Sequence, residues 1–308
     1  MARLFDDVML GSIELFCLAA ELESFTAAAT ASGLTPAAVS RSISRLEARL
    51  GVPLFVRSTR KIRLTESGRA YLLQCRQALN QLVEAEREVT GQQQVPAGTV
   101  RISMATPFAH YRVLPLVAAF RAQYPAVRVE AHLGNRNIDF AAEGYDLAIR
   151  GRVPPDSGLV ARKLEDAELV VVAAPAYLAR MGPPQTPEAL DAHDCIQFIL
   201  PRSGQPIPWM FQRDGVDFEV ATQGGTCCLE DPQGGVTLAR HGAGLVQTYR
   251  FLAQEALAQG QLVEVLQAWG GRSRPFSLLY PQNRHIPLRV RVFIDYLVQK
   301  LRPADAAL

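Results

Sequence analysis

The sequence predicts two folded units of different class: an all-α N-terminal unit that ends in a long helix, and a C-terminal α/β unit. Helical periodicity with capping residues fills most of residues 1–92, whereas strand and helix patterns alternate from residue 99 onwards. The chain has 308 residues, of which 48% are hydrophobic, and this is enough for more than one core. Its formal net charge is only +2, so a local concentration of charge is informative.

Residues 24–51 are typical of two short helices joined by a tight turn. Ser24 suits the N-cap of the first helix, and Gly33 can adopt the positive φ that a sharp turn requires. Thr35 suits the N-cap of the second helix and Pro36 its first position, where no N–H is needed. The apolar residues of the second helix recur at spacings of three and four and are predicted to pack inward; they are Val39, Ile43, Leu46 and Leu50.

The opposite face of the second helix is small, polar and basic. Beyond Thr35 and Pro36, it presents Ala37, Ser40, Arg41, Ser44 and Arg45. Serine can hydrogen-bond to bases or phosphate, and arginine can grip guanine or clamp phosphate. An amphipathic helix with a solvated charged face is the alternative. The caps, the turn and the two faces together favour a helix-turn-helix, whose second helix enters the major groove of DNA.

The run from Leu54 to Thr65 has two short apolar pieces around a basic tip, which predicts a small hairpin, a wing beside the second helix. Arg57, Arg60 and Lys61 of this wing are expected to contact the minor groove or the phosphate backbone. Residues 41–63 contain seven basic residues and one acid, Glu47. Such a concentration in a nearly neutral chain indicates phosphate contact.

A long polar helix with a heptad-like apolar seam is predicted next, over residues 66–92. The seam consists of Leu72, Cys75, Leu79, Leu82 and Val89 and is interrupted at Glu86. A surface helix and a dimerisation helix are both compatible with this pattern. The second is favoured because no other core is apparent for the seam to cover. Residues 93–98 follow as a hinge by composition.

From Thr99 the alternation of strands and helices predicts a mostly parallel sheet with helices on its faces. Ligands of such sheets bind beyond the carboxyl ends of the strands. The residues at these ends are Thr106, Pro107, Phe108, Gly134, Asn135, Arg136, Arg150, Asp231, Gln247 and Thr248. Pro107 and Gly134 can equally serve only to shape turns, and the arginines can equally face solvent. If the arginines do line a site, they favour an anionic ligand such as a small carboxylate.

The N-terminal segments SFTAAA, LTPAAVSRSISRLEARLGVPLFVRSTR and LTESG resemble those of the LysR-type transcriptional regulators, and the similarity extends over nearly the whole chain. The resemblance implies a winged helix-turn-helix domain over residues 1–65, a linker and dimerisation helix over 66–92 and a hinge over 93–98. Residues 99–308 would form a periplasmic-binding-protein-like effector domain. Its first lobe would comprise about 99–163 and 270–308, and its second lobe about 164–269.

The resemblance also implies a function. A regulator of this type binds double-stranded promoter DNA as a dimer of dimers, and a small effector between the lobes alters the access of RNA polymerase. The strand-end residues would line the effector cleft, and no cofactor or catalytic residue is expected. No segment is long and apolar enough to span a bilayer, and the N-terminus lacks the pattern of a signal peptide. A cytoplasmic location without a membrane partner is therefore expected.

Two other functions stay open. An enzyme on a binding-protein-like fold could use Cys195 or Cys228 as nucleophile, although neither lies near a histidine in a known motif, and there is no G-x-S-x-G, P-loop or HExxH motif. A redox-sensing LysR-type regulator could use Cys195, which follows LDAHDC where some members of the family carry a sensor cysteine. A resolving cysteine close behind it is missing. The five histidines show no metal-ligand spacing, so no metal site is predicted.

Overall fold

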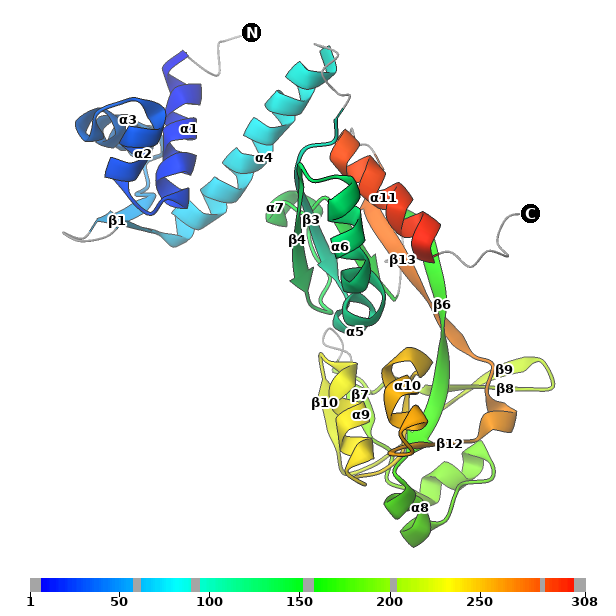
Figure 1. Ribbon diagram of the computed structural model, residues 1–308. Coiled ribbons are helices and arrows are strands. Elements are labelled where there is room, and N and C mark those ends of the chain that lie inside the picture. Colours follow the sequence, from blue (N-terminus) through cyan, green and yellow to red (C-terminus); the bar gives the residue numbers. More distant parts are fainter. Residues whose placement is uncertain are drawn as a thin grey trace. The chain divides into compact units, whose positions relative to one another are not determined.

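A computed structural model describes residues 7–57, 62–89, 95–151, 158–199, 204–282 and 286–301. These residues form two compact units, Met1–Gln94 with Ala141–Gly144, and Val95–Phe140 with Tyr145–Leu308. The first unit is helical with one two-stranded hairpin, and the second is α/β around a seven-stranded sheet (Figure 1). The two fold classes predicted from the sequence are therefore confirmed.

The helices and the hairpin of the N-terminal unit follow the predicted order. They are α1 (Asp7–Glu21), α2 (Phe25–Ser32), α3 (Pro36–Leu50), β1 (Phe55–Arg57), β2 (Ile62–Leu64) and α4 (Glu66–Val89). Ser24 Oγ accepts a hydrogen bond from Ala27 N at 3.1 Å, and Thr35 Oγ1 accepts one from Ala38 N at 3.2 Å. Gly33 ends α2 with a φ of 68°. The capping residues predicted for both helices are confirmed.

The inward face of α3 forms much of the core of this unit. Val39 and Ile43 are fully buried, Leu46 is 3% exposed, and all three pack in one cluster with Phe16 of α1. The prediction is wrong for Leu50, which is 37% exposed. Leu50 lies in the last turn of α3, directly before Gly51 at a φ of 70°, where the helix runs past the core.

Helix α4 covers the same core with its first half. Cys75 is 5% exposed, and Leu72 and Leu79 pack against the cluster. A hydrogen bond from the Cys17 thiol of α1 lowers the pKa of Cys75. The interpretation that this part of the seam has no core to cover is therefore wrong. Leu82, further along, is 49% exposed, and the side chain of Val89 lies outside the described residues.

The C-terminal unit contains the alternating elements that were predicted. Its strands are β3 (Gly98–Met104), β4 (Val127–Leu133), β5 (Leu147–Arg150), β6 (Leu159–Ala173), β7 (Gln197–Ile199), β8 (Trp209–Arg213), β9 (Val216–Val220), β10 (Cys227–Leu229), β11 (Val246–Tyr249), β12 (Val263–Val265) and β13 (Ser273–Pro281). Its α-helices are α5 (Thr106–Phe108), α6 (Leu114–Gln123), α8 (Pro175–Met181), α9 (Pro232–Arg240), α10 (Arg250–Ala258) and α11 (Leu288–Leu301), and a π-helical turn, Ala109–Val113, joins α5 to α6. Between β4 and β5 the chain also forms the short helix α7 (Phe140–Glu143), most of which belongs to the first unit.

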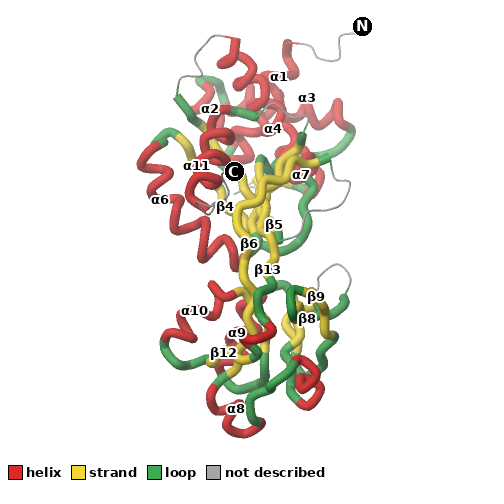
Figure 2. The backbone as a smooth tube through the Cα atoms, turned by 90° about the vertical axis from the view of Figure 1, so that its right-hand side faces the viewer, coloured by secondary structure: helices red, strands yellow, loops and turns green. Residues whose placement is uncertain are grey.

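The large sheet has the order β11-β6-β13-β5-β3-β4, with β12 also paired to β6. Strand β3 is parallel to β4 and β5, but β13 is antiparallel to β5 and β6, and β11 and β12 are antiparallel to β6. Within the large sheet, parallel pairing is therefore limited to β3, β4 and β5, and the prediction of a mostly parallel sheet is wrong for its other strands. The reason is that β6 and β13 run side by side through both lobes, as Figures 1 and 2 show.

The last helix returns to the first lobe. Phe293 of α11 is fully buried, and its ring lies 4.7 Å from that of Phe120 in α6. Within the described part of the chain, no helix combines the length and apolar character needed to cross a membrane.

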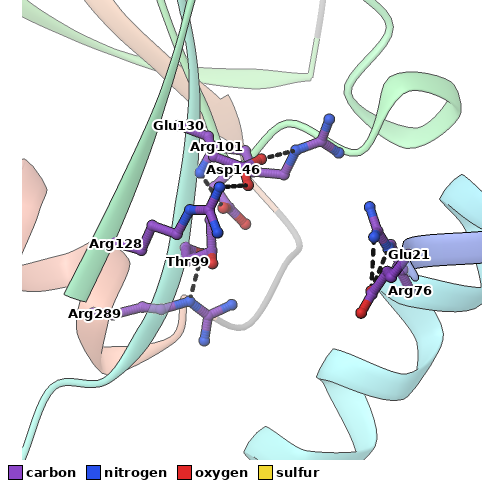
Figure 3. A network of polar contacts seen from close by, with 8 residues as sticks. All are labelled: Glu21, Arg76, Thr99, Arg101, Arg128, Glu130, Asp146 and Arg289. Atoms are coloured by element: carbon purple, nitrogen blue, oxygen red, sulfur yellow. Dashed lines mark hydrogen bonds and ion pairs between the residues drawn. The ribbon is translucent and has the colours of Figure 1, made fainter. Parts of the chain in front are cut away.

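Polar contacts reinforce each unit separately (Figure 3). In the N-terminal unit, Arg76 of α4 pairs with Glu21 of α1 at 2.6 Å. In the C-terminal unit, Arg289 of α11 donates to the Thr99 carbonyl at 2.8 Å, and the Asp146 carboxylate accepts from the Arg101 backbone N at 2.9 Å. The first residues of β3 are thus held both by a side chain of α11 and by the carboxylate that precedes β5.

Candidate functional sites

The face of α3 that was predicted to contact DNA is accessible. Thr35, Pro36, Ala37, Arg41, Ser44 and Arg45 are exposed, and Ser40 is half-buried. The buried side of the same helix is anchored by its apolar residues and by Ser42, whose hydroxyl lies 2.7 Å from that of Ser12. The helix therefore presents small, polar and basic side chains from a rigid base. Contact of these side chains with DNA stays a prediction.

The hairpin is fixed to α3 by Glu47, the one acid in the basic stretch of residues 41–63. Glu47 Oε1 accepts hydrogen bonds from the backbone N of Leu54 at 2.8 Å and of Phe55 at 3.1 Å. Thr65 Oγ1 donates to the Pro53 carbonyl at 2.8 Å and accepts from Gly68 N at 2.9 Å. These contacts set the position of the hairpin base beside α3.

The hairpin itself is present as predicted, with β1 and β2 antiparallel and Phe55 opposite Leu64. Its tip, with Arg60 and Lys61, lies outside the described residues, as does the side chain of Arg57. Their contact with DNA is therefore still a prediction.

In the C-terminal unit, the residues after β3 and β4 meet through Asn135. Thr106 N donates to Asn135 Oδ1 at 3.3 Å, and Asn135 Nδ2 donates to the carbonyl of Glu230 in the second lobe. Pro107 and Phe108 are buried, and the Phe108 ring stacks on Phe276 at 4.3 Å. Asn135 thus connects the lobes, whereas Pro107 and Phe108 belong to the core.

Arg150 has a different role from the one considered for it. It is only 6% exposed. Its guanidinium donates to the carbonyls of Ser103 at 3.0 Å and Arg136 at 2.8 Å, and to the Ser103 hydroxyl at 2.8 Å. It thus holds together the carboxyl ends of β3 and β5 and the loop after β4. A guanidinium committed in this way neither faces solvent nor supports the expectation of an anionic ligand.

A cavity of about 80 Å³ lies in the second lobe and is called the second-lobe pocket below. Its lining residues are Leu169, Ile196, Gln197, Phe198, Ile207, Pro208, Trp209, Cys228, Pro232, Gly235, Val246, Gln247, Thr248, Tyr249 and Arg274. Of the residues predicted to bind an effector, Gln247 and Thr248 line it. Asp231 caps α9, with its carboxylate accepting from Gln233 N at 3.1 Å, and the predicted residues of the first lobe are not part of the lining.

Two residues that line the second-lobe pocket each carry a buried polar atom without a hydrogen-bond partner among the described residues: Gln197 Oε1 and Thr248 Oγ1. Gln197 is 6% exposed and Thr248 is 5% exposed. In contrast, both polar atoms of the Gln247 amide have a partner: Oε1 accepts from Met210 N and Nε2 donates to the Met210 carbonyl, both at 2.9 Å. A buried polar atom without a partner is costly, so such atoms in a cavity mark where a bound molecule can supply one.

Sequence reasoning missed Gln197. The available signal was a single glutamine within the apolar run CIQFIL, of which Gln197–Ile199 form β7 and pair with β10. That this glutamine shares a pocket with Thr248 depends on pairing between distant segments, which one sequence does not reveal.

Cys195 and Cys227 differ sharply in exposure. Cys195 is 1% exposed, and burial raises its pKa to about 12. Its thiol donates weakly to the Leu190 carbonyl at 3.8 Å. Cys227 is exposed. Because the thiolate is the reactive form, Cys195 is poorly suited to be a peroxide sensor or a nucleophile at neutral pH.

Iodoacetamide should therefore modify Cys227 at least about a hundredfold faster than Cys195 in the native protein at pH 7. Peptide mass spectrometry over a time course measures both rates. In urea the two rates should converge, which controls for intrinsic reactivity. Equal labelling of the two cysteines in the native protein would restore Cys195 as a candidate sensor.

Comparison with known protein families assigns both units. Residues 10–69 match the description "Bacterial regulatory helix-turn-helix protein, lysR family", and residues 93–302 match "LysR substrate binding domain". The chain is 34% identical over 301 residues to the probable HTH-type transcriptional regulator LtrA of Klebsiella pneumoniae, covering 97% of this chain and 96% of LtrA. It is 32% identical over 291 residues to the regulator CrgA of Neisseria meningitidis serogroup B, covering 94% of this chain and 96% of CrgA.

Solved structures agree with this similarity. The structure of CrgA from Neisseria meningitidis has a TM-score of 0.59 at 31% identity and covers 95% of this chain and 99% of that one. Full-length AphB of Vibrio cholerae has a TM-score of 0.60 at 27% identity, with 95% and 99% coverage. Both are described as LysR-type regulators.

Proposed function

The chain belongs to the LysR family of DNA-binding transcriptional regulators, and from this premise we propose that it controls a promoter in response to a small molecule bound in the second-lobe pocket. The proteins that it matches are regulators and not enzymes, which excludes the enzyme alternative. The observation that carries the proposal is that two residues lining a mostly apolar cavity, Gln197 and Thr248, each carry a buried polar atom without a partner among the described residues.

On the DNA side, we infer that α3 enters the major groove and that the basic hairpin contacts the backbone beside it. Two copies paired through the second half of α4, where Leu82 and Val83 are exposed, would present two such helices to a pseudo-palindromic site. A dimer of dimers, acting on RNA polymerase at a promoter in the cytoplasm, completes the proposal.

Coupling between ligand and DNA requires that the ligand favour one arrangement of the protein over another. Tyr249 of the second-lobe pocket supports such a route. Its ring stacks on Phe251 at 5.3 Å, and Phe251 lies 6.3 Å from Phe108 and 5.7 Å from Tyr111 in the first lobe. Tyr111 belongs to the π-helical turn, a distortion that is frequent at functional sites. A ligand that displaces Tyr249 would therefore change how the lobes pack.

Arg41→Ala should weaken binding to the promoter region beside the gene by at least about fivefold, because Arg41 is exposed on the DNA-facing side of α3. A mobility-shift titration at two salt concentrations measures the loss, and the salt dependence should fall as one phosphate contact disappears. Arg121→Ala, which removes the same charge from the exposed surface of the other unit, should leave the affinity unchanged. If Arg41→Ala bound promoter DNA as tightly as the wild type, α3 would not be the helix that enters the major groove.

A ligand screen tests the effector side. A molecule that occupies the pocket at a hundredfold excess over its Kd should stabilise the protein by about 2.7 kcal/mol and raise its Tm. The same molecule should change the affinity or the footprint of the protein on promoter DNA. A pocket ligand without any effect on the DNA complex would contradict the proposed regulation.

A further inference from the structure

We propose that the second-lobe pocket selects a single-ring aromatic molecule that carries a hydroxyl group, and that it rejects molecules with only hydrogen-bond acceptors at that position. The inference rests on the proposed function, since it specifies the chemistry of the ligand that the same pocket would take. It derives from Gln197, Thr248 and the walls around them.

The amide of Gln197 has a fixed orientation. Its Nε2 donates to the Cys195 carbonyl and to Thr222 Oγ1, both at 2.9 Å. Because a carbonyl can only accept, the nitrogen must face Cys195, and both amide hydrogens are then in use. The oxygen Oε1 of this lining residue is left as an acceptor without a partner among the described residues, so its partner must donate a hydrogen. A carboxylate oxygen at that position would place two acceptors in contact without a hydrogen between them.

Thr248 adds the second requirement. Its hydroxyl can both donate and accept, and it is 5% exposed without a partner among the described residues. A ligand hydroxyl can serve both residues, since it can donate to Gln197 Oε1 and accept from Thr248 Oγ1. An ether or a carboxylate lacks the hydrogen for Gln197, and an ammonium group lacks the acceptor for Thr248.

The other lining residues of the pocket favour an aromatic ligand that carries no positive charge. Phe198, Ile207 and Trp209 provide apolar and aromatic surface, and Trp209 is 3% exposed. The cavity of about 80 Å³ is smaller than the roughly 150 Å³ of an engineered cavity that binds benzene, so it can enclose no more than part of a single ring and excludes a larger aromatic system. Arg274 is the charged residue of the described lining, and it disfavours a cation.

The first test needs no ligand. Thr248→Val keeps the shape of the side chain and removes the unpartnered hydroxyl, so it should raise the Tm of the protein by about 2–4 °C. As a matched control, Thr237→Val removes an exposed hydroxyl that donates to the Gln233 carbonyl at 3.2 Å and should give no rise. A lower Tm for Thr248→Val would show that the hydroxyl is already satisfied and would overturn the proposal.

The second test uses matched probes on the full chain: phenol against anisole, and 4-hydroxybenzoate against 4-methoxybenzoate. Calorimetric titration should show that the better hydroxyl compound binds at least about tenfold more tightly than its methyl ether. Thr248→Val should reduce this preference several-fold, and so should Gln197→Met, which removes the acceptor at similar volume. Equal binding within both pairs, no binding of either hydroxyl compound at millimolar concentration, or an unchanged preference in Thr248→Val would each overturn the inference.

A promoter-binding assay separates this inference from the proposed function. If a molecule without a hydrogen-bond donor occupies the pocket and changes promoter binding, the inference fails and the proposed function stands. If the hydroxyl compounds bind selectively but leave the DNA complex unchanged, the chemistry of the pocket stands and the proposed function fails.

Discussion

Gly68→Ala is expected to destabilise the DNA-binding unit by about 3 kcal/mol and to weaken promoter binding severely. A Cβ atom at Gly68 would lie 2.1 Å from the Leu54 carbonyl oxygen and 3.0 Å from its carbon. Leu54 is fully buried, and its carbonyl accepts a hydrogen bond from Thr65 N at 3.0 Å. Because the clash is with backbone, no side chain can rotate to relieve it. The start of α4 must move away from the hairpin base, and the hairpin loses its fixed position beside α3.

Urea unfolding followed by circular dichroism, with hydrogen exchange of α3 and α4, measures the loss of stability. Gly11→Ala is the matched control in the same unit, because a Cβ atom at Gly11 meets nothing within 4 Å. Since alanine is the better helix former, that variant should be more stable by up to about 1 kcal/mol. Wild-type stability and DNA affinity in Gly68→Ala would contradict the close approach of α4 to the hairpin.

The local features of the N-terminal unit were predictable because they depend on neighbouring residues. The caps at Ser24 and Thr35 and the turn at Gly33 each need only a few residues in one segment. Two features that did not follow from the sequence there are tertiary. Glu47 holds the hairpin base and Cys75 is buried against α1, because segments distant in sequence meet at those points.

In the C-terminal unit, too, local features were predictable and tertiary ones were not. The order of strands and helices followed from periodicity, but the antiparallel course of β6 and β13 did not, because sheet pairing is not local. Charge was misleading at Arg150, since a buried arginine that binds carbonyls has the same sequence pattern as one that binds a ligand. The pocket was predicted in part, through Gln247 and Thr248, because both follow the general position of ligands at strand ends.

Arg150→Met is expected to destabilise the C-terminal unit by about 3–4 kcal/mol. Methionine fills similar apolar space, so the change mainly removes the polar group. The carbonyls of Ser103 and Arg136 and the Ser103 hydroxyl would each lose a charged donor that now lies within 3.0 Å. Because these groups belong to the ends of β3 and the loop after β4, the loss should also loosen the segment that places Asn135 against the second lobe.

Thermal and urea unfolding of the full chain measure this effect, and Arg128→Met is its control. The Arg128 side chain is 76% exposed and lies 3.6 Å from Glu130, so its loss should cost no more than about 0.5 kcal/mol. The stability of Arg150→Lys should lie between the stabilities of Arg150→Met and Arg128→Met. An ammonium keeps the charge, but it cannot donate to all three groups at once as the planar guanidinium does. If Arg150→Met were as stable as the wild type and lost affinity for carboxylate ligands, the guanidinium would face a ligand, and the structural role derived from its hydrogen bonds would be wrong.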